Sequence, residues 1–212
     1  ATQIPGWTGL ELAATVGRWF DCPGAAGNDA HYAAVAEHWK GNARFARDMA
    51  FLLTGHRSGF ALIIDGRLHV GRSGAAGEFG NLAHLHENEA TELLASEGIT
   101  LAELLTAAQA GDVRANDVVS RMARGVAQGT AVLAMAIDPE VVVLGGPFAK
   151  GNPLLLDRVR EELVGLCINP PVVELSCLGD EAVALGAART ALDLVESSER
   201  MFGSAELSPQ PG

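Results

Sequence analysis

One stretch of the sequence, residues 53–81, constrains the fold of this chain more than any other. It reads LTGHRSGFALIIDGRLHVGRSGAAGEFGN, and its centre has the pattern of a β-hairpin: the β-rich run 60–64, a two-residue Asp65–Gly66 turn and a second short run, 67–70. A glycine-containing loop precedes the hairpin, and a loop with four glycines follows it and leads to the carboxylate Glu78. We expect these two loops, at the ends of one hairpin, to hold a ligand.

The composition predicts a water-soluble protein with a full hydrophobic core. The chain has 212 residues, of which 48% are hydrophobic and 25 are glycine, enough for one large or two small domains. No apolar run is long enough to span a bilayer, so we expect no membrane contact. The three cysteines are scattered without metal-type spacing, which favours a reducing compartment and hence the cytoplasm.

The charge of the chain bears on its partners. A formal net charge of −11 argues against binding of nucleic acid by this chain itself, because phosphate neutralisation needs clustered Lys and Arg. If the protein binds DNA, another part of it does so. The chain begins with Ala and no charged and apolar leader follows, so we expect a fragment or a processed chain.

Helices and strands alternate along the rest of the chain. Besides the hairpin, the apolar runs predict strands at Met49–Leu53, Val141–Leu144 and Val172–Leu175. Helical spacing and caps predict helices within residues 1–21, from Asn28–Asp29 to about His38, at 101–110, at about 113–137, from Pro153 and after Gly179–Asp180. This order predicts an α/β fold in which the hairpin joins the strands at 141–144 and 172–175 in one mixed sheet with helices on both faces.

Four motifs, in this order, resemble the ROK family of bacterial sugar kinases and sugar-responsive transcriptional repressors. They are NDA at 28–30, DGRL at 65–68, GAAGEFG at 74–80 and DPEVVVLGG at 138–146. The resemblance covers nearly the whole chain and implies the actin-like, ribonuclease-H-like ATPase fold.

That resemblance also implies a division of the chain. Residues 23–200 would be the carboxy-terminal lobe, and residues 1–22, which contain a family-like IPGW segment, would be the end of the amino-terminal lobe. The family's first phosphate-binding loop, Asp-x-Gly-Gly-Thr, does not occur in this chain. Residues 201–212 have the composition of a flexible tail.

Asn28 and Asp29 open the alanine-rich helix, and two interpretations of them stay open. Either residue can be a helix cap, which is a sufficient physical reason for its presence. The resemblance implies instead that Asp29 is the catalytic base of the family's kinases, accepting the proton of a sugar hydroxyl, and that Asn28 hydrogen-bonds the sugar. The family usually reads Glu-Asn-Asp-Ala-Asn here, whereas this chain has Gly27 and His31 at the outer positions.

The loop from Gly55 to Gly59 resembles the kinases' Gly-Thr-Gly-x-Gly, whose amides cradle phosphate because glycine permits close approach. His56 replaces the threonine and Arg57 the middle glycine, so we expect a blocked cradle, although Arg57 could itself pair with a phosphate. Gly145–Gly146 would let a nucleotide approach the backbone in a kinase, or would serve only a strand-to-helix turn. The cofactor-binding candidates, for ATP and Mg²⁺ only if the chain is a kinase, are Gly55, Gly59, Gly145 and Gly146.

The loop after the hairpin departs from the family's structural zinc site. The family reads Glu-x-Gly-His and then Cys-x-Cys-Gly-x-x-Gly-Cys, whereas this chain has Asn81 in place of the histidine and no cysteine until Cys167. A zinc site of that type cannot be built, so we expect no metal. The polar residues His84, His86, Glu87 and Glu89 are interpreted as a solvated loop, because no spacing fixes a ligand geometry.

The resemblance implies sugar contacts in the same region. Glu78 and Asn81 fall in the family's Glu-x-Gly-His motif, and Glu92 falls where the family has a glutamate after its last cysteine. Glu92 could equally be a surface residue of a helix. With Asn28 and Asp29, these are the expected substrate-binding residues.

Three functions fit this pattern. The first is the sugar-sensing and oligomerisation region of a ROK transcriptional regulator without kinase activity, which binds DNA only through an upstream domain outside this chain. The second is a fragment of an ATP-dependent sugar kinase similar to glucokinase. The third is a purely structural oligomerisation lobe. We expect a homo-oligomer, most simply a homodimer, that binds a sugar or sugar derivative.

Overall fold

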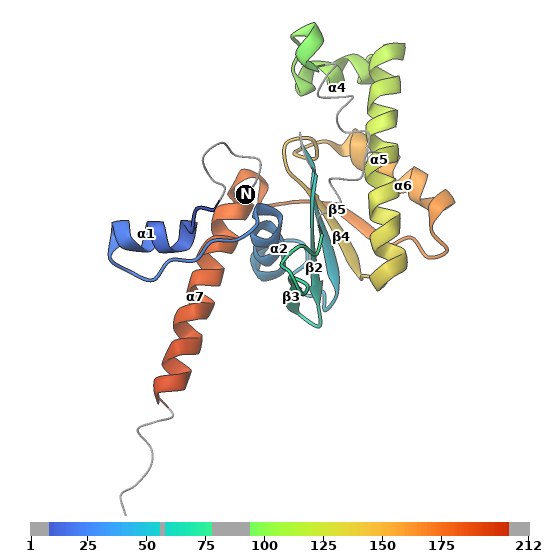
Figure 1. Ribbon diagram of the computed structural model, residues 1–212. Coiled ribbons are helices and arrows are strands. Elements are labelled where there is room, and N and C mark those ends of the chain that lie inside the picture. The colour runs from blue at the N-terminus through green and yellow to red at the C-terminus, as the bar shows by residue number, and fades with distance from the viewer. Residues whose placement is uncertain (1–8, 56–57, 78–93, 204–212) are drawn as a thin grey trace, which may run out of the picture.

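The computed structural model describes residues 9–55, 58–77 and 94–203, and Figure 1 shows their arrangement. The sheet has five strands in the order β3-β2-β1-β4-β5. Their bounds are Met49–Leu53 for β1, Gly59–Ile64 for β2, Arg67–His69 for β3, Val141–Gly145 for β4 and Val172–Leu175 for β5. The predicted single mixed sheet is thereby confirmed, because the hairpin β2–β3 and the strands β4 and β5 all belong to it.

Strand β1 joins the antiparallel and parallel parts of the sheet. It pairs antiparallel with β2, Met49 opposite Ile63, and parallel with β4, Met49 opposite Val141. The hairpin turn has φ of 54° at Asp65 and 71° at Gly66, the left-handed conformation that two-residue hairpin turns require and that Asp-Gly readily adopts.

Two helical layers cover the two faces of the sheet (Figure 1). The helices α4 (Leu101–Gln109), α5 (Val113–Ile137) and α6 (Pro153–Leu166) pack on the face formed by residues such as Leu52, Leu62 and Leu144. The helices α2 (Asp29–Lys40) and α7 (Ala182–Gly203) lie on the opposite face, over Phe51, Ile63 and Val143. Alternating side chains of each strand supply the two cores, as the period of two in a strand requires.

A buried carboxylate on helix α2 contacts the residue that follows the edge strand β5. Glu37 is fully buried and accepts hydrogen bonds from the Ser176 hydroxyl, at 2.5 Å, and from the backbone N–H of Asn42, at 3.0 Å. A buried carboxylate needs such donors to offset its lost hydration. Asn42 also donates to the carbonyl oxygen of Leu175, at the end of β5.

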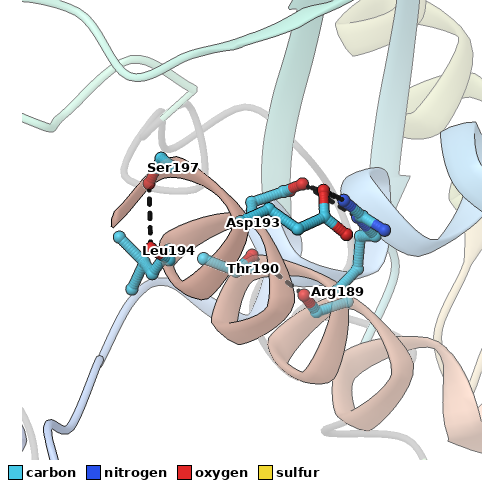
Figure 2. Close-up of polar contacts among 7 residues, drawn as sticks. Arg189, Thr190, Asp193, Leu194 and Ser197 are labelled. Atoms are coloured by element: carbon cyan, nitrogen blue, oxygen red, sulfur yellow. Dashed lines mark hydrogen bonds and ion pairs between the residues drawn. The ribbon is translucent and has the colours of Figure 1, made fainter. Parts of the chain in front are cut away.

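Polar contacts of α7 add to this packing. Figure 2 shows the Arg189 guanidinium paired with Asp193 one turn along the helix, and Arg189 also pairs with Glu196 and lies over the ring of Trp39 on α2. The hydroxyl of Thr190 donates to the carbonyl oxygen of Gly186, and that of Ser197 to Leu194. The contact with Trp39 joins α7 to the carboxyl-terminal part of α2.

The ends of the chain differ from the rest. Helix α1 (Leu12–Phe20) contributes no buried residue, and its Trp19 and Phe20 are 74% and 72% exposed. Helix α7 follows a short 3-10 turn, Gly179–Glu181, and ends at Gly203, so most of the predicted tail lies outside the described residues. Within the described ranges, no helix has both the length and the apolar character needed to cross a membrane.

Candidate functional site

Four segments named by the sequence patterns meet at one edge of the sheet. Strands β1 and β4 are parallel and both end there, and β2, antiparallel to β1, begins there. Crevices outside the carboxyl ends of parallel strands are the usual ligand sites of such sheets. The segments are the start of α2, the loop between β1 and β2, the loop Gly71–Gly77 after β3, and Gly145–Gly146 at the end of β4.

The start of α2 presents Asn28 and Asp29 at this edge. The side-chain oxygen of Asn28 accepts hydrogen bonds from the backbone N–H of Ala30, at 2.9 Å, and of His31, at 3.3 Å, so Asn28 is the helix cap. Asp29 is the first helical residue; its side chain is exposed and one oxygen accepts from Ala30 N–H at 2.8 Å. A carboxylate in the first turn is also favoured by the helix dipole.

The start of β2 packs directly against the start of α2. A Cβ atom built on Gly59 would lie 2.9 Å from Cβ of Ala30 and 4.0 Å from a carboxylate oxygen of Asp29. The structure therefore brings Asp29 and Gly59 together, 30 residues apart in sequence. The glycine is needed at this contact because a side chain would clash with the helix.

Ser58, beside Gly59, was not singled out from the sequence. Its hydroxyl oxygen is buried and has no hydrogen-bond partner among the described residues. A buried hydroxyl without a partner costs roughly 1–3 kcal/mol, which makes such a group notable next to the start of β2. Its place next to Gly59, within the predicted ligand loop, is the signal that could have identified it.

The two glycines at the end of β4 have no room for a side chain, because other atoms of the protein occupy the positions where their Cβ atoms would lie. A Cβ atom on Gly145 would lie 2.4 Å from the ring of Phe51, and one on Gly146 would lie 2.2 Å from the carbonyl oxygen of Thr54. The N–H and the hydroxyl of Thr54 both donate to the carbonyl oxygen of Gly145, at 2.8 and 2.7 Å. Close packing of β1 on β4 is thus a sufficient reason for both glycines.

Gly55 differs from these two glycines, because a Cβ atom there would lie 3.6 Å from Pro147, an ordinary van der Waals contact. His56 and Arg57, the residues predicted to block the phosphate cradle, lie outside the described residues, so the blocked cradle stays a prediction.

The loop Gly71–Gly77 is held against both α2 and β2. Nε2 of His31 lies 3.3 Å from the carbonyl oxygen of Ala76, and the N–H of Phe60 donates to the carbonyl oxygen of Gly77 at 3.2 Å. In the sequence, His31 is marked only by its difference from the family's motif. Its position three residues before the buried Ala34 of an alanine-rich helix is the signal that it faces inward.

Several predicted site residues cannot be placed. Glu78, Asn81 and Glu92, predicted to contact sugar, lie outside the described residues, as does the polar group His84, His86, Glu87 and Glu89. Over the ranges that are described, no three His, Cys, Asp or Glu side chains gather as a metal site would need.

On α2, burial raises the pKa of Tyr32, so this phenol remains protonated at neutral pH.

Comparisons with known proteins show which proteins this chain is similar to. The model of the ROK family matches residues 1–93 and 82–193. The chain is 26% identical to a glucokinase from Halalkalibacterium halodurans, covering 85% of this chain and 67% of the relative. It is 27% identical to a xylose repressor from Caldicellulosiruptor bescii, covering 85% of this chain and 55% of the repressor.

Among solved structures, a ROK hexokinase from Thermus thermophilus is 30% identical and matches with a TM-score of 0.73, over 88% of this chain and 70% of that chain. The chain therefore spans about two thirds of its kinase relatives and about half of the repressor. Kinases and a repressor both stand among these relatives.

Proposed function

This chain belongs to the ROK family, and from that premise we propose that it is the sugar-sensing region of a transcriptional regulator without kinase activity. The observation that carries the proposal is the contrast between two parts of the same edge. Asp29 is exposed at the start of α2, whereas the space beside Gly145 and Gly146 is taken up by Phe51 and Thr54. The exposed carboxylate of Asp29 supports sugar binding, and His56 and Arg57, at the family's threonine and glycine positions, support loss of the phosphate cradle.

Sugar hydroxyls need only carboxylate and amide partners, which Asp29 and Asn28 supply. Phosphoryl transfer instead relies on positioning and on neutralising the charge of the γ-phosphate, so a base without a cradle gains little. Glu78, Asn81 and Glu92 complete the proposed sugar contacts. The effector is a hexose or an amino sugar, the protein works in the cytoplasm, and DNA is bound through a domain outside this chain.

A second candidate is an ATP-dependent sugar kinase, of which this chain would be a fragment. The glucokinase and hexokinase relatives favour it, as does the exposed carboxylate of Asp29. In that case Asp29 would accept the proton of the sugar hydroxyl.

The test uses the natural full-length protein and calorimetry with glucose and with N-acetylglucosamine. We expect weak to moderate binding of one of these sugars, no turnover of ATP with either, and about 10- to 150-fold weaker binding for Asp29→Asn, because a charged hydrogen bond contributes roughly 1.5–3 kcal/mol. The sugar's effect on DNA affinity should weaken in parallel, with the fold unchanged.

Asp112→Asn is the matched control, because Asp112 also lies at a helix start, where it caps α5 by accepting from Ala115 N–H at 2.8 Å. It should leave sugar affinity unchanged. Turnover of ATP with a hexose that Asp29→Asn abolishes would replace the regulator by the kinase. Loss of affinity in both variants would remove Asp29 from the sugar site.

We also propose that the protein holds no structural zinc, because the histidine and all three cysteines of the family site are missing. Elemental analysis of purified protein should find far less than one zinc per chain. A content of about one zinc per chain would contradict this and make His84 and His86 the first ligand candidates.

A further inference from the structure

We propose that His31 is a positioning residue: it holds the loop Gly71–Gly77 against the start of α2 and thereby sets the shape of the sugar site. This inference rests on the proposed function above. It adds a residue whose side chain contacts the loop rather than the sugar.

The side chain of His31 is well placed for this role. It is 7% exposed, two residues after the exposed Asp29, so it turns inward where Asp29 turns outward. Its Nε2 lies 3.3 Å from the carbonyl oxygen of Ala76. A carbonyl oxygen only accepts, so Nε2 carries the hydrogen and donates it.

The loop that His31 contacts has little stiffness of its own. Gly71, Gly74 and Gly77 have φ of 70°, 75° and 88°, values that glycine reaches at no steric cost and that leave a loop many alternatives when it is not held. The bond from Ala76 N–H to Val70 closes the loop on itself. Among the described residues, its hydrogen bonds to other elements are those with Phe60 and His31.

These contacts form a closed set of three segments. Gly59 at the start of β2 packs on Ala30, and the next residue, Phe60, binds Gly77 through its backbone. His31 then joins the loop to the helix that carries Asn28 and Asp29. Without His31 the loop would keep its bond to β2 but lose its fixed position relative to Asp29.

Helix α2 contains a matched control for this contact. His38 lies seven residues further along the helix, about 10 Å away along its axis, and its Nε2 lies 3.0 Å from the carbonyl oxygen of Ala46. The bond is of the same type, from the same helix to a backbone carbonyl, but at the end remote from Asp29. Its removal should lower stability without touching the site.

The experiment compares His31→Ala, His31→Gln and His38→Ala in the full-length protein by hydrogen exchange and by calorimetry with glucose and N-acetylglucosamine. His31→Ala should speed exchange of residues 70–77 roughly 2- to 12-fold and weaken sugar binding by a similar factor, the effect of one lost hydrogen bond. His31→Gln, whose amide can donate to Ala76, should restore both. His38→Ala should speed exchange near residue 46 but leave both the exchange of residues 70–77 relative to the rest of the chain and the sugar affinity unchanged.

Unchanged exchange of residues 70–77 in His31→Ala would overturn the inference. So would faster exchange with unchanged sugar affinity, because the loop would then lie outside the site. If the unaltered protein binds neither sugar, the proposed function and the sugar half of this inference both fail, while exchange still decides whether His31 holds the loop.

Discussion

At the scale of single residues, Thr100 and Glu103 close the amino-terminal end of α4 by reciprocal hydrogen bonds. The Thr100 hydroxyl oxygen accepts from Glu103 N–H at 3.2 Å, and the carboxylate of Glu103 accepts from Thr100 N–H at 2.7 Å and from its hydroxyl at 2.8 Å. The backbone bond first, and then the hydroxyl, lower the pKa of Glu103 below its ordinary value of 4.5. The charged form is therefore the one that stabilises the fold.

A prediction about pH follows from the sign of that shift. A carboxyl whose folded pKa is depressed adds stability at pH above its unfolded value, and this is lost as pH falls below 4.5 through the folded pKa. Glu103→Gln keeps an acceptor for Thr100 but cannot titrate. Its urea unfolding free energy should thus fall less between pH 5 and pH 3 than that of the unaltered protein.

Glu161→Gln, which removes the exposed carboxylate of Glu161 on α6, serves as the control for the loss of one surface charge. Identical profiles for the unaltered protein and Glu103→Gln would mean that the carboxylate of Glu103 contributes nothing in solution.

Residues of the candidate site were predictable from sequence only where the chemistry is local. The Asn28 cap depends on bonds to the next three residues, so the pattern before an alanine-rich helix predicts it. The role of His31 depends on Ala76, and the environment of Ser58 on how the loop packs, neither of which leaves a mark in nearby sequence. The sugar contacts by Glu78, Asn81 and Glu92 remain predictions.

At the scale of elements, the tight contact between the ends of β1 and β4 gives a second prediction. Gly146 has φ of 86°, and a Cβ atom there would lie 2.2 Å from the carbonyl oxygen and 2.9 Å from the nitrogen of Thr54. Gly146→Ala should therefore combine the cost of a left-handed alanine, about 1–2 kcal/mol, with a forced shift of β1 against β4. Denaturant unfolding should show a loss well above about 2 kcal/mol.

Gly111→Ala isolates the first of these effects. Gly111 has φ of 90°, close to that of Gly146, but no heavy atom lies within 4 Å of its Cβ position. It should lose only about 1–2 kcal/mol. Equal losses in the two variants would contradict the packing role assigned to Gly146.

Helices and strands were predictable from the sequence where the residues that form a turn or end a helix are clear. The Asp65–Gly66 turn and the left-handed Asp138 after Ile137, with φ of 47°, are local features, and the hairpin and the end of α5 lie where they were predicted. The central place of β1 is different, because its neighbour β4 is about 90 residues away in sequence. Such long-range pairing depends on burial of both faces of the sheet in the folded protein, and the hydrophobic pattern of β1 or of β4 alone does not reveal it.

At the scale of the whole molecule, two groups of exposed apolar side chains are candidate surfaces for self-association. Ion pairing of Arg124 with Glu162 and hydrogen bonds of Arg158 with Ser120 and Asn116 show that α5 and α6 run side by side in the same direction. Near the carboxyl-terminal ends of these helices, the exposed apolar side chains are Val132, Met135, Val164, Leu166 and Ile168, the last 99% exposed, and we call this group the α5–α6 surface. Helix α1 carries the second, with Trp19 and Phe20.

The last prediction concerns self-association. Contiguous exposed apolar patches are uncommon on monomers, and a symmetric dimer that covers about 800 Å² on each chain would bury one of them. We expect light scattering of the purified protein to give the mass of two chains. If the α5–α6 surface is the interface, Ile168→Asp should shift the equilibrium between dimer and monomer towards monomer. If helix α1 is the interface, Trp19→Ser should do so. In each case the reason is that a buried charge, or a lost aromatic side chain, at the centre of an interface weakens association. A monomeric mass at every practical concentration would refute the dimer, and a dimer unaffected by both substitutions would show that it forms through neither surface.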